Sequence, residues 1–274
     1  MVGTKNCALV AALTPLLACL LTTTPAAATP TGPEITHPQD DWAGSQIAKH
    51  EGGGIRPMAG PPPATADPVP MGMDVSSHQG NVNWTTVARD GAAFVYVKAT
   101  EAGSYVNPFF AQQYTGAYRA GLVRGAYHFA TPSSSPGAAQ ANWFVNHGGR
   151  WSADGRTLPP ALDLEYNPYG QSCYGMSPAA LVSWVRAFVD TVHARTTRWP
   201  TIYTSTSWWS LCMGGYAGFT ADPLWIARYN THVGALPPGW RTWVIWQFAD
   251  AGRFPGDQDE FGGTAAALRA LASG

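Results

Sequence analysis

From residue 71 onward, short apolar segments of strand length alternate with segments of helical periodicity, and this alternation constrains the fold more than any other feature of the chain. The predicted strands are 71–76, 92–100, 122–130, 158–166, 201–205, 223–229, 243–250 and 256–261. The predicted helices are 83–91, 107–121, 135–148, 177–196 and 263–273. Apolar strands that alternate with helices are typical of a parallel sheet buried on both faces. Eight strands in roughly 200 residues, with several helices missing, predict a small, irregular α/β barrel of the TIM type.

Polar side chains fall near the carboxyl ends of these predicted strands. In chain order they are Asp74, Lys98, Glu101, Tyr127, His128, Asp163, Glu165, Tyr203, Arg228, Tyr229, Gln247, Asp250 and Asp257. In barrels of this type the functional groups gather at the carboxyl ends of the strands. The coincidence supports the barrel and predicts a functional site at that end.

Asp163 and Glu165 stand in the segment LPPALDLEYNP, where a buried strand would ordinarily carry apolar residues. Because side chains of a strand alternate between two faces, both carboxylates point into one space, and Leu162 and Leu164 point toward the covering helices. Two carboxylates held close together cannot both ionise without cost, so the pKa of one rises and that group can act as an acid near neutral pH. The pair predicts a general acid with an electrostatic or orienting partner, as glycosidic bond cleavage requires.

The alternatives for this pair are a solvated loop, an acid that caps a helix, and a metal site. The apolar neighbours disfavour a solvated loop. The seven His residues are scattered, and the chain contains no EF-hand loop, no H-E-x-x-H motif and no paired-Cys motif. A nucleophile elbow of the form G-x-S-x-G is also missing. We therefore expect an acid–base site that needs neither a metal nor another cofactor.

Composition narrows the class of partner. The chain has 16 Lys and Arg against 17 Asp and Glu, a balance that argues against nucleic acid, since phosphate binding needs a basic surface. Twelve Trp and eleven Tyr fit either stacking on sugar rings or packing in a core.

The first 28 residues have the pattern of a secretory signal peptide. A lysine precedes the apolar stretch 7–24, and small residues that suit a cleavage site come after it. We therefore expect a secreted, extracellular protein. Removal of the signal takes away Cys7 and Cys19 and leaves Cys173 and Cys212, which we expect to form a disulfide outside the cell. The alternative is two free thiols.

Residues 29–70 differ in composition from residues 71–274. The stretch GGGIRPMAGPPPATADPVP is rich in Pro and Gly and has no apolar periodicity with which to build a core. Upstream of it, 35–52 could hold a short helix. The composition fits a pro-segment or a largely disordered linker that leads into a catalytic domain at 71–274.

Eight motifs in a fixed order carry a resemblance to a known family. They are MGMDVSSHQGNVNW, FVYVKATEAGSYVNPFF, AGLVRGAYHFA, PPALDLEY, YTSTSWW, PLWIARY, VIWQFAD and GDQDEF. Together they closely resemble the glycoside hydrolase family 25 lysozymes, the Chalaropsis-type N-acetylmuramidases, over 71–274. The resemblance implies an irregular barrel of about five β/α units plus three further strands. It also implies hydrolysis of the β-1,4 bond between N-acetylmuramic acid and N-acetylglucosamine in peptidoglycan.

The resemblance also implies roles for individual residues. Glu165 matches the general acid/base, and Asp163 matches the acid that orients the acetamido group or stabilises developing positive charge. Asp74 and Asp257 match acids on the floor of the groove. The residues that match the lining of the sugar subsites are Tyr127, Tyr203, Trp225, Tyr229 and Gln247.

The chain departs from the family pattern at two positions. The family often reads ATEG where this chain reads KATEAG, which implies a slightly longer loop after the second strand. Asp259 stands where the family commonly has Asn, and an extra carboxylate near the site could raise the pKa of a neighbour.

The expected partner is the peptidoglycan glycan strand, bound by a monomer that contacts neither nucleic acid nor, after signal cleavage, a membrane. Two other readings of the chain are a secreted barrel glycosidase of the chitinase type and a non-catalytic module that binds the cell wall. All four acids that match the family, Asp74, Asp163, Glu165 and Asp257, are present, which argues against a non-catalytic module.

Overall fold

The computed structural model describes residues 1–3, 34–52 and 68–274. Nearly all of the predicted signal peptide, and most of the Pro/Gly-rich stretch, therefore lie outside the described residues. The described strands are β1 (Met71–Val75), β2 (Phe94–Glu101), β3 (Tyr105–Val106), β4 (Val123–Phe129), β5 (Ala161–Asp163), β6 (Thr201–Thr204), β7 (Leu224–Ala227), β8 (Ile245–Ala249) and β9 (Asp257–Phe261).

These strands form one sheet that closes on itself. The order is β1-β9-β8-β7-β6-β5-β4-β2-β3, and an additional pairing of β1 with β2 closes an eight-stranded barrel, with β3 attached to β2 as a hairpin. The ladders from β1–β2 through β7–β8 are parallel, whereas β9 is antiparallel to both β8 and β1. A parallel crossover needs a dozen or more residues, and the connection from β8 to β9 is too short for one. The expectation of a wholly parallel sheet was therefore wrong at β9, and the irregular mixed barrel implied by the resemblance is confirmed.

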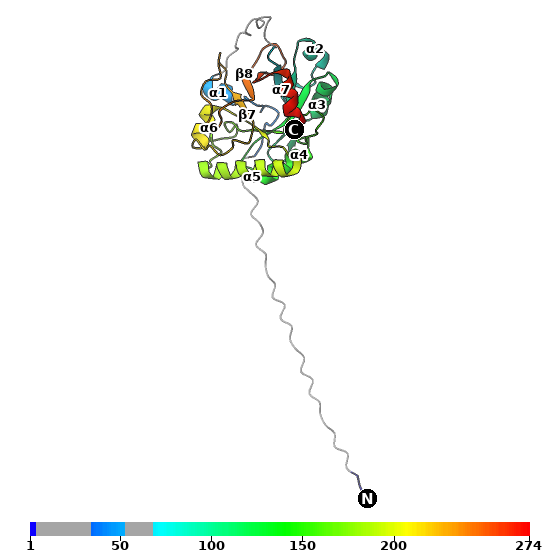
Figure 1. Cartoon of the computed structure of the whole chain (residues 1–274). Helices are drawn as coiled ribbons and strands as arrows, with labels where there is room; N and C mark the ends of the chain where they lie inside the picture. Colours follow the sequence, from blue (N-terminus) through cyan, green and yellow to red (C-terminus); the bar gives the residue numbers. More distant parts are fainter. Residues whose placement is uncertain (4–33, 53–67) are drawn as a thin grey trace. The chain divides into compact units, whose positions relative to one another are not determined.

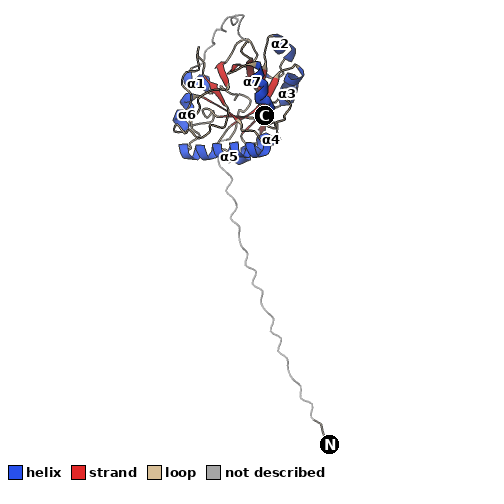
Figure 2. Ribbon diagram, in the orientation of Figure 1, coloured by secondary structure: helices blue, strands red, loops and turns tan. Residues whose placement is uncertain are grey.

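Helices follow the first five barrel strands and surround the sheet (Figures 1 and 2). They are α2 (Trp84–Arg89), α3 (Phe110–Arg119), α4 (Gly137–Asn146), α5 (Pro178–Thr196) and α6 (Thr206–Cys212), with α7 (Ala265–Ser273) closing the chain. Five β/α units and three further strands are confirmed. None of the helices in the described part of the chain is both long enough and apolar enough to cross a bilayer.

Local sequence explains where the longest helix begins. Ser177 precedes α5 and accepts a hydrogen bond from the backbone N–H of Ala180, and Pro178 occupies the first helical position, where its missing N–H is not needed. Helix α6 was not predicted, since its seven residues are too few to show a helical period. Its cap, Ser205, accepts from the N–H of Trp208.

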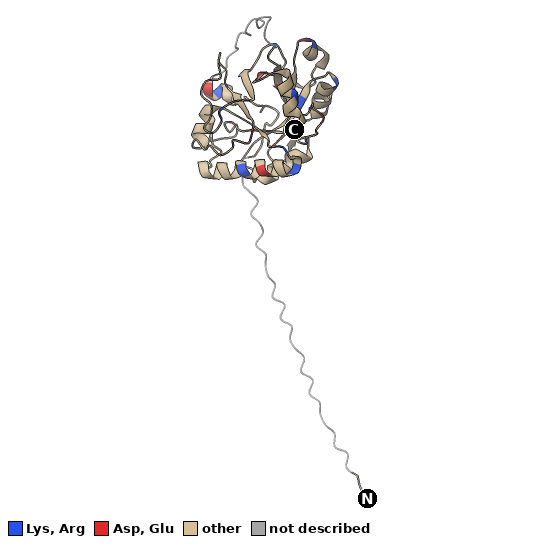
Figure 3. Ribbon diagram, viewed as in Figure 1, with Lys and Arg blue, Asp and Glu red and all other residues tan. Residues whose placement is uncertain are grey.

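The hydrophobic core is formed by side chains of both the sheet and the helices. Leu162 and Leu164 are fully buried in an apolar cluster that includes Leu181 and Phe188 of α5, as their alternation with the two carboxylates predicts. Charged residues are sparse along the ribbon, as Figure 3 shows.

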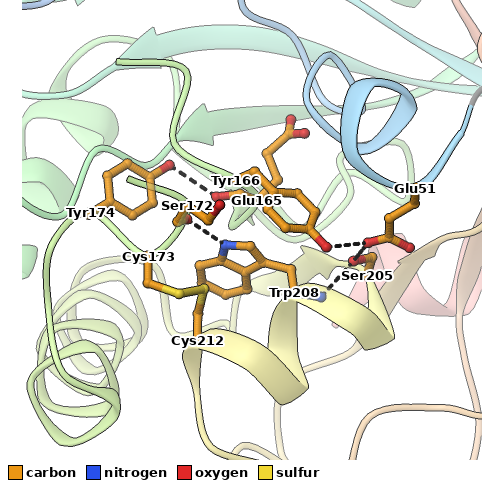
Figure 4. Close-up of a disulfide and its surroundings, with 9 residues drawn as sticks. All are labelled: Glu51, Glu165, Tyr166, Ser172, Cys173, Tyr174, Ser205, Trp208 and Cys212. Atoms are coloured by element: carbon orange, nitrogen blue, oxygen red, sulfur yellow. Dashed lines mark hydrogen bonds between the residues drawn. A yellow bond between two sulfur atoms is a disulfide. The ribbon is translucent and has the colours of Figure 1, made fainter. Parts of the chain in front are cut away.

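The disulfide between Cys173 and Cys212 is confirmed and joins the segment after β5 to the last turn of α6 (Figure 4). Next to it, the indole N–H of Trp208 donates to the carbonyl of Ser172 at 3.2 Å. The bridge spans 39 residues, and closing a loop of that length contributes about 4 kcal/mol in the chain-entropy model. It fixes the segment that leaves the D-x-E strand.

Candidate active site

Four carboxyl side chains from three strands are buried in the barrel. Asp74 lies on β1, Asp257 on β9 and Asp163 on β5, and Glu165 follows two residues after β5 ends. Each is at most 2% exposed. Asp74 and Asp257 stand opposite each other in the antiparallel ladder. The sequence prediction therefore named acids that the barrel brings into its interior.

Gln247 of β8 links two of these acids. Its side-chain N–H₂ donates to Asp74 at 2.7 Å and to Asp257 at 3.2 Å. Its side-chain carbonyl accepts from the hydroxyls of Tyr203 at 2.7 Å and Tyr229 at 2.9 Å. Since the tyrosines donate to one end of the amide and the carboxyls accept from the other, the orientation of the amide is fixed. Gln247 thus holds two predicted floor acids and two predicted subsite tyrosines in one network.

Trp225 lies inside the barrel among aromatic rings. Its indole stacks on Tyr96 with centroids 4.8 Å apart and meets the edges of Tyr203 and Tyr127 at 4.7 and 6.2 Å. Its N–H donates to Asp259 at 2.9 Å. The ring is fully buried, so the contacts that the structure gives it are packing contacts. Contact between Trp225 and a sugar stays a prediction.

Asp163 is fully buried, and neither of its oxygens has a hydrogen-bond partner among the described residues. Burial, followed by the charge of Glu165, raises the pKa of Asp163 well above its ordinary value. A buried carboxyl without a partner is costly, so such groups mark strain or function. Asp163 is available to accept a hydrogen bond from a bound molecule.

Glu165 is also fully buried but accepts three backbone hydrogen bonds. Its Oε1 accepts from the N–H of Gly44 at 3.0 Å, and its Oε2 accepts from Gln46 at 2.9 Å and Ile47 at 3.1 Å. Burial raises the pKa of Glu165 to about 8, against the opposing effect of these three amides. In this arrangement Glu165 holds a proton at neutral pH.

The floor acids are shifted in the same direction. Burial raises the pKa of Asp74 to about 8, and burial together with the charges of Asp74 and Asp259 raises that of Asp257 well above its ordinary value. A cluster of acids with raised pKa values in one cavity is typical of a site that performs acid–base chemistry.

Lys98 supplies a cation at the edge of this cluster. It forms a buried ion pair with Glu101 at 2.6 Å. Tyr169, which the sequence analysis did not single out, donates to Glu101 at 2.7 Å. It follows the D-x-E strand in an irregular segment, where no periodic signal points to it.

Residues 41–47 lie over the site, a position that the sequence did not predict. Of the two expectations for 29–70, a largely disordered linker is wrong at these residues, because Asp41, Ala43 and Ile47 are at most 1% exposed and a helix, α1 (Ile47–Glu51), is present. The expectation of a pro-segment stays a prediction. The predicted short helix is therefore present, and residues 34–52 pack against the barrel rather than extending away from it. The signal was hard to find because the contacts to Glu165 come from backbone amides, which every non-proline residue carries.

Two cavities flank this segment. One, of about 370 Å³, is lined by Trp42, His78 and Asp257 among others. The other, of about 350 Å³, is lined by Ile47, Tyr166 and Tyr229 among others. Residues of the segment line both cavities, so it separates two spaces that each reach a predicted site residue.

Comparison with known proteins identifies the family of the chain. The profile of glycosyl hydrolases family 25 matches residues 73–257. Lysozyme M1 of Streptomyces globisporus is 44% identical over 225 residues, which cover 78% of this chain and 76% of that protein. The N,O-diacetylmuramidase of Chalaropsis sp. is 46% identical over 209 residues, which cover 74% of this chain and 99% of that protein. The family 25 lysozyme structure from Aspergillus fumigatus superposes with a TM-score of 0.74 at 48% identity, covering 75% of this chain and 100% of the other. The chain belongs to glycosyl hydrolase family 25 and is a glycoside hydrolase of the lysozyme, or muramidase, type.

Proposed function

We propose that this lysozyme cleaves the β-1,4 bond between N-acetylmuramic acid and N-acetylglucosamine in peptidoglycan, with Glu165 as the general acid/base. The observation that carries the proposal is the buried pair of Asp163 and Glu165, both with raised pKa values, beside the floor acids Asp74 and Asp257. The predicted signal peptide supports action outside the cell after residues 1–28 are removed.

In the first step, Glu165 donates its proton to the glycosidic oxygen as the bond to C1 of the muramic acid breaks. Positive charge develops at C1 and the ring oxygen, and preorganised polar groups in a dry site stabilise such charge strongly. With residues 41–47 over it, Glu165 has a pKa that burial raises to about 8. We expect a bound glycan strand, which also excludes water, to keep this pKa raised so that Glu165 carries a proton at neutral pH. The resulting carboxylate then takes a proton from the attacking water in the second step.

Asp163 has the position and the open hydrogen-bonding capacity to accept the N–H of the substrate's 2-acetamido group. Holding that group would turn its carbonyl oxygen toward C1 for a substrate-assisted reaction, which is a known exception to the scheme of two enzyme carboxylates. Both oxygens of Asp163 lack a partner among the described residues, which supports this role. We expect the anomeric configuration to be retained.

Product analysis tests the bond assignment. Because residues 41–47 cover Glu165, the assay uses the full chain with a protease site inserted between residues 52 and 68, both intact and after cutting. Purified peptidoglycan is digested, new ends are reduced with borohydride, and the products are identified by mass spectrometry. Reduced muramic acid ends are expected, and NMR of the unreduced product should show the β anomer first.

Other products would support the rival readings. Reduced glucosamine ends would mean that the other glycosidic bond is cleaved. Cleavage of chitin in preference to peptidoglycan would favour a glycosidase of the chitinase type. A cut chain that pellets with the wall and releases no new ends would leave a binding module.

A further inference from the structure

Residues 36–51 occupy the space in front of the catalytic acids with their backbone as well as their side chains. Glu165 accepts hydrogen bonds from Gly44, Gln46 and Ile47 at 2.9–3.1 Å, so both of its carboxyl oxygens are engaged by main-chain amides. A general acid must reach the glycosidic oxygen within hydrogen-bond distance. Glu165 cannot do so while these three amides surround it.

The same segment contacts the residues predicted to bind sugar. The N–H of Ala43 donates to the hydroxyl of Tyr127 at 3.2 Å, and its carbonyl accepts from Gln247 at 2.8 Å. Tyr229 lies 3.5 Å from the carbonyl of Gly44. A peptide group offers the same N–H and C=O pair as an acetamido group, so these contacts use the donors and acceptors that an N-acetyl sugar would need.

Contacts on both sides hold the segment in place. Upstream, Lys98 donates to the carbonyls of Pro38 at 2.8 Å and Asp41 at 2.5 Å, and the Trp42 ring stacks on His78 with centroids 4.3 Å apart. Downstream, the ring of His50 stacks on Tyr166 at 4.0 Å.

At its downstream end the segment is tied by Glu51. This carboxylate accepts from the hydroxyl of Tyr166 at 3.0 Å and from that of Ser205, as Figure 4 shows. Tyr166 follows Glu165 directly in the chain, and Ser205 caps α6, so this end of the segment is fixed to the stretch that carries Glu165 and to the start of α6.

Gly44 is packed tightly against the floor of the site. It adopts φ +100°, and a Cβ added there would overlap the hydroxyl of Tyr229 and come within 2.8 Å of Asp257 and of Gln247. The two cavities, of about 370 and 350 Å³, reach Asp257 and Tyr229 from opposite sides of the segment. With the segment removed, the two spaces would meet over Gln247 and form one groove.

We propose that residues 36–51 are an autoinhibitory segment, which fills the middle of the glycan-binding groove and sequesters Glu165 until it is displaced. The inference rests on the proposed function of that groove. A tethered segment is held at a high effective concentration, so it blocks the groove in the intact chain, whereas a cut segment dissociates on dilution.

The test compares peptidoglycan hydrolysis by the full chain before and after cutting at a site inserted between residues 52 and 68. Cutting should raise the rate at least about tenfold, the change expected if the segment is docked in about nine of ten intact molecules. A synthetic peptide of residues 34–52, added to the cut and diluted protein, should inhibit it again.

Two glycine variants of the intact chain give a matched comparison. Gly44→Ala should activate the uncut protein, because its Cβ collides with the groove, and it should have no further effect after cutting. Gly52→Ala places the same side chain at a similar φ of +89°, with no atom within 4 Å of its Cβ, and should leave the uncut protein inhibited. Comparing the two variants distinguishes the effect of the Cβ clash at Gly44 from the effect of placing an alanine at a positive φ.

Hydrogen exchange supplies a readout that does not depend on activity. The amides of Gly44, Gln46 and Ile47 should be protected in the intact chain and exposed in Gly44→Ala. Equal rates for intact and cut protein, or unprotected amides in the intact chain, would overturn the inhibition and leave the proposed function standing. Inactivity of every form, the cut chain included, would overturn the proposed function and with it the inhibition.

Discussion

The side-chain amide of Gln247 donates to Asp74 at 2.7 Å, and this bond ties the strand that opens the barrel to one of the strands that close it. A carboxylate in place of this amide would face Asp74 and Asp257 with no proton to donate. Gln247→Glu should therefore lower the free energy of unfolding at pH 7 by about 3 kcal/mol, because it places another carboxyl among buried acids and removes the N–H₂ group from which both of them accept. Hydrolysis should fall as well, since both floor acids lose their positioning contact.

Denaturant unfolding measures the change, with Gln171→Glu on the exposed surface as the control. The loss should shrink at pH 4, where all three carboxyls carry protons. An equal loss at both pH values would contradict a purely electrostatic cause.

Asp259 replaces the asparagine common in the family, and burial, followed by the charge of Asp74, raises its pKa well above the ordinary value. One oxygen accepts from Trp225 at 2.9 Å, and the other has no partner in the described part of the chain. An acid whose pKa is raised on folding loses stability as the pH climbs from its unfolded pKa, near 4, to its folded pKa. Asp259→Asn keeps the acceptor and removes this loss.

The variant should therefore unfold at a higher temperature than the wild type at pH 7 and at nearly the same temperature at pH 3. The unfolding temperatures of the variant and the wild type, measured from pH 3 to pH 7, test this expectation. A stabilisation that persists undiminished at pH 3 would show that ionisation is not its source.

The disulfide between Cys173 and Cys212 should contribute measurably to the free energy of unfolding. Replacing both cysteines by serine should lower the free energy of unfolding by about 4 kcal/mol, since the unfolded chain regains the freedom of a 39-residue loop. The comparison is equilibrium unfolding of the variant, of the wild type, and of the wild type under reducing conditions. The free energies of unfolding of the last two should differ by a similar amount. A loss below about 1 kcal/mol would mean that the unfolded chain does not gain the expected freedom when the bridge is removed.

Ala102 adopts φ +49° in the turn between β2 and β3, in the left-handed region that favours glycine. The structure thus shows a tight hairpin at the position where the KATEAG motif departs from the family. Ala102→Gly should raise the free energy of unfolding by about 0.5–1 kcal/mol, because relief of the backbone strain exceeds the added freedom of the unfolded chain. Chemical denaturation detects a change of this size, and a destabilised variant would show that the methyl group contributes packing that outweighs the strain.

Sequence reasoning reached the barrel because its strands are continuous apolar runs with chemical groups at their ends. Asp163 and Glu165 could be assigned to one space from the two-residue period of a strand alone. Strand direction was harder: β9 looks like any other strand in sequence, and only the short connection after β8 makes it antiparallel. Helix α6 was too short to show a period.

The segment at 41–47 escaped prediction for a different reason. Its binding depends on backbone amides of Gly44, Gln46 and Ile47 that meet a carboxylate about 120 residues away, and no side-chain pattern records such a contact. Composition indicated a linker because the segment builds no core of its own. It is ordered by the core of the barrel.

The role of Glu165 is the central claim, and the rate of peptidoglycan hydrolysis by Glu165→Gln tests it most directly. The measurement uses the cut chain, so that loss of the segment's contacts does not confuse the result, with Asp190→Asn on the exposed face of α5 as the matched control. Glu165→Gln should lower kcat by about 10²–10⁴-fold, the range for loss of a general acid, while its circular dichroism and Tm show a folded protein. Asp190→Asn should match the wild type. A folded Glu165→Gln protein that releases muramic acid ends within about threefold of the wild-type rate, far less than loss of a general acid causes, would contradict the account.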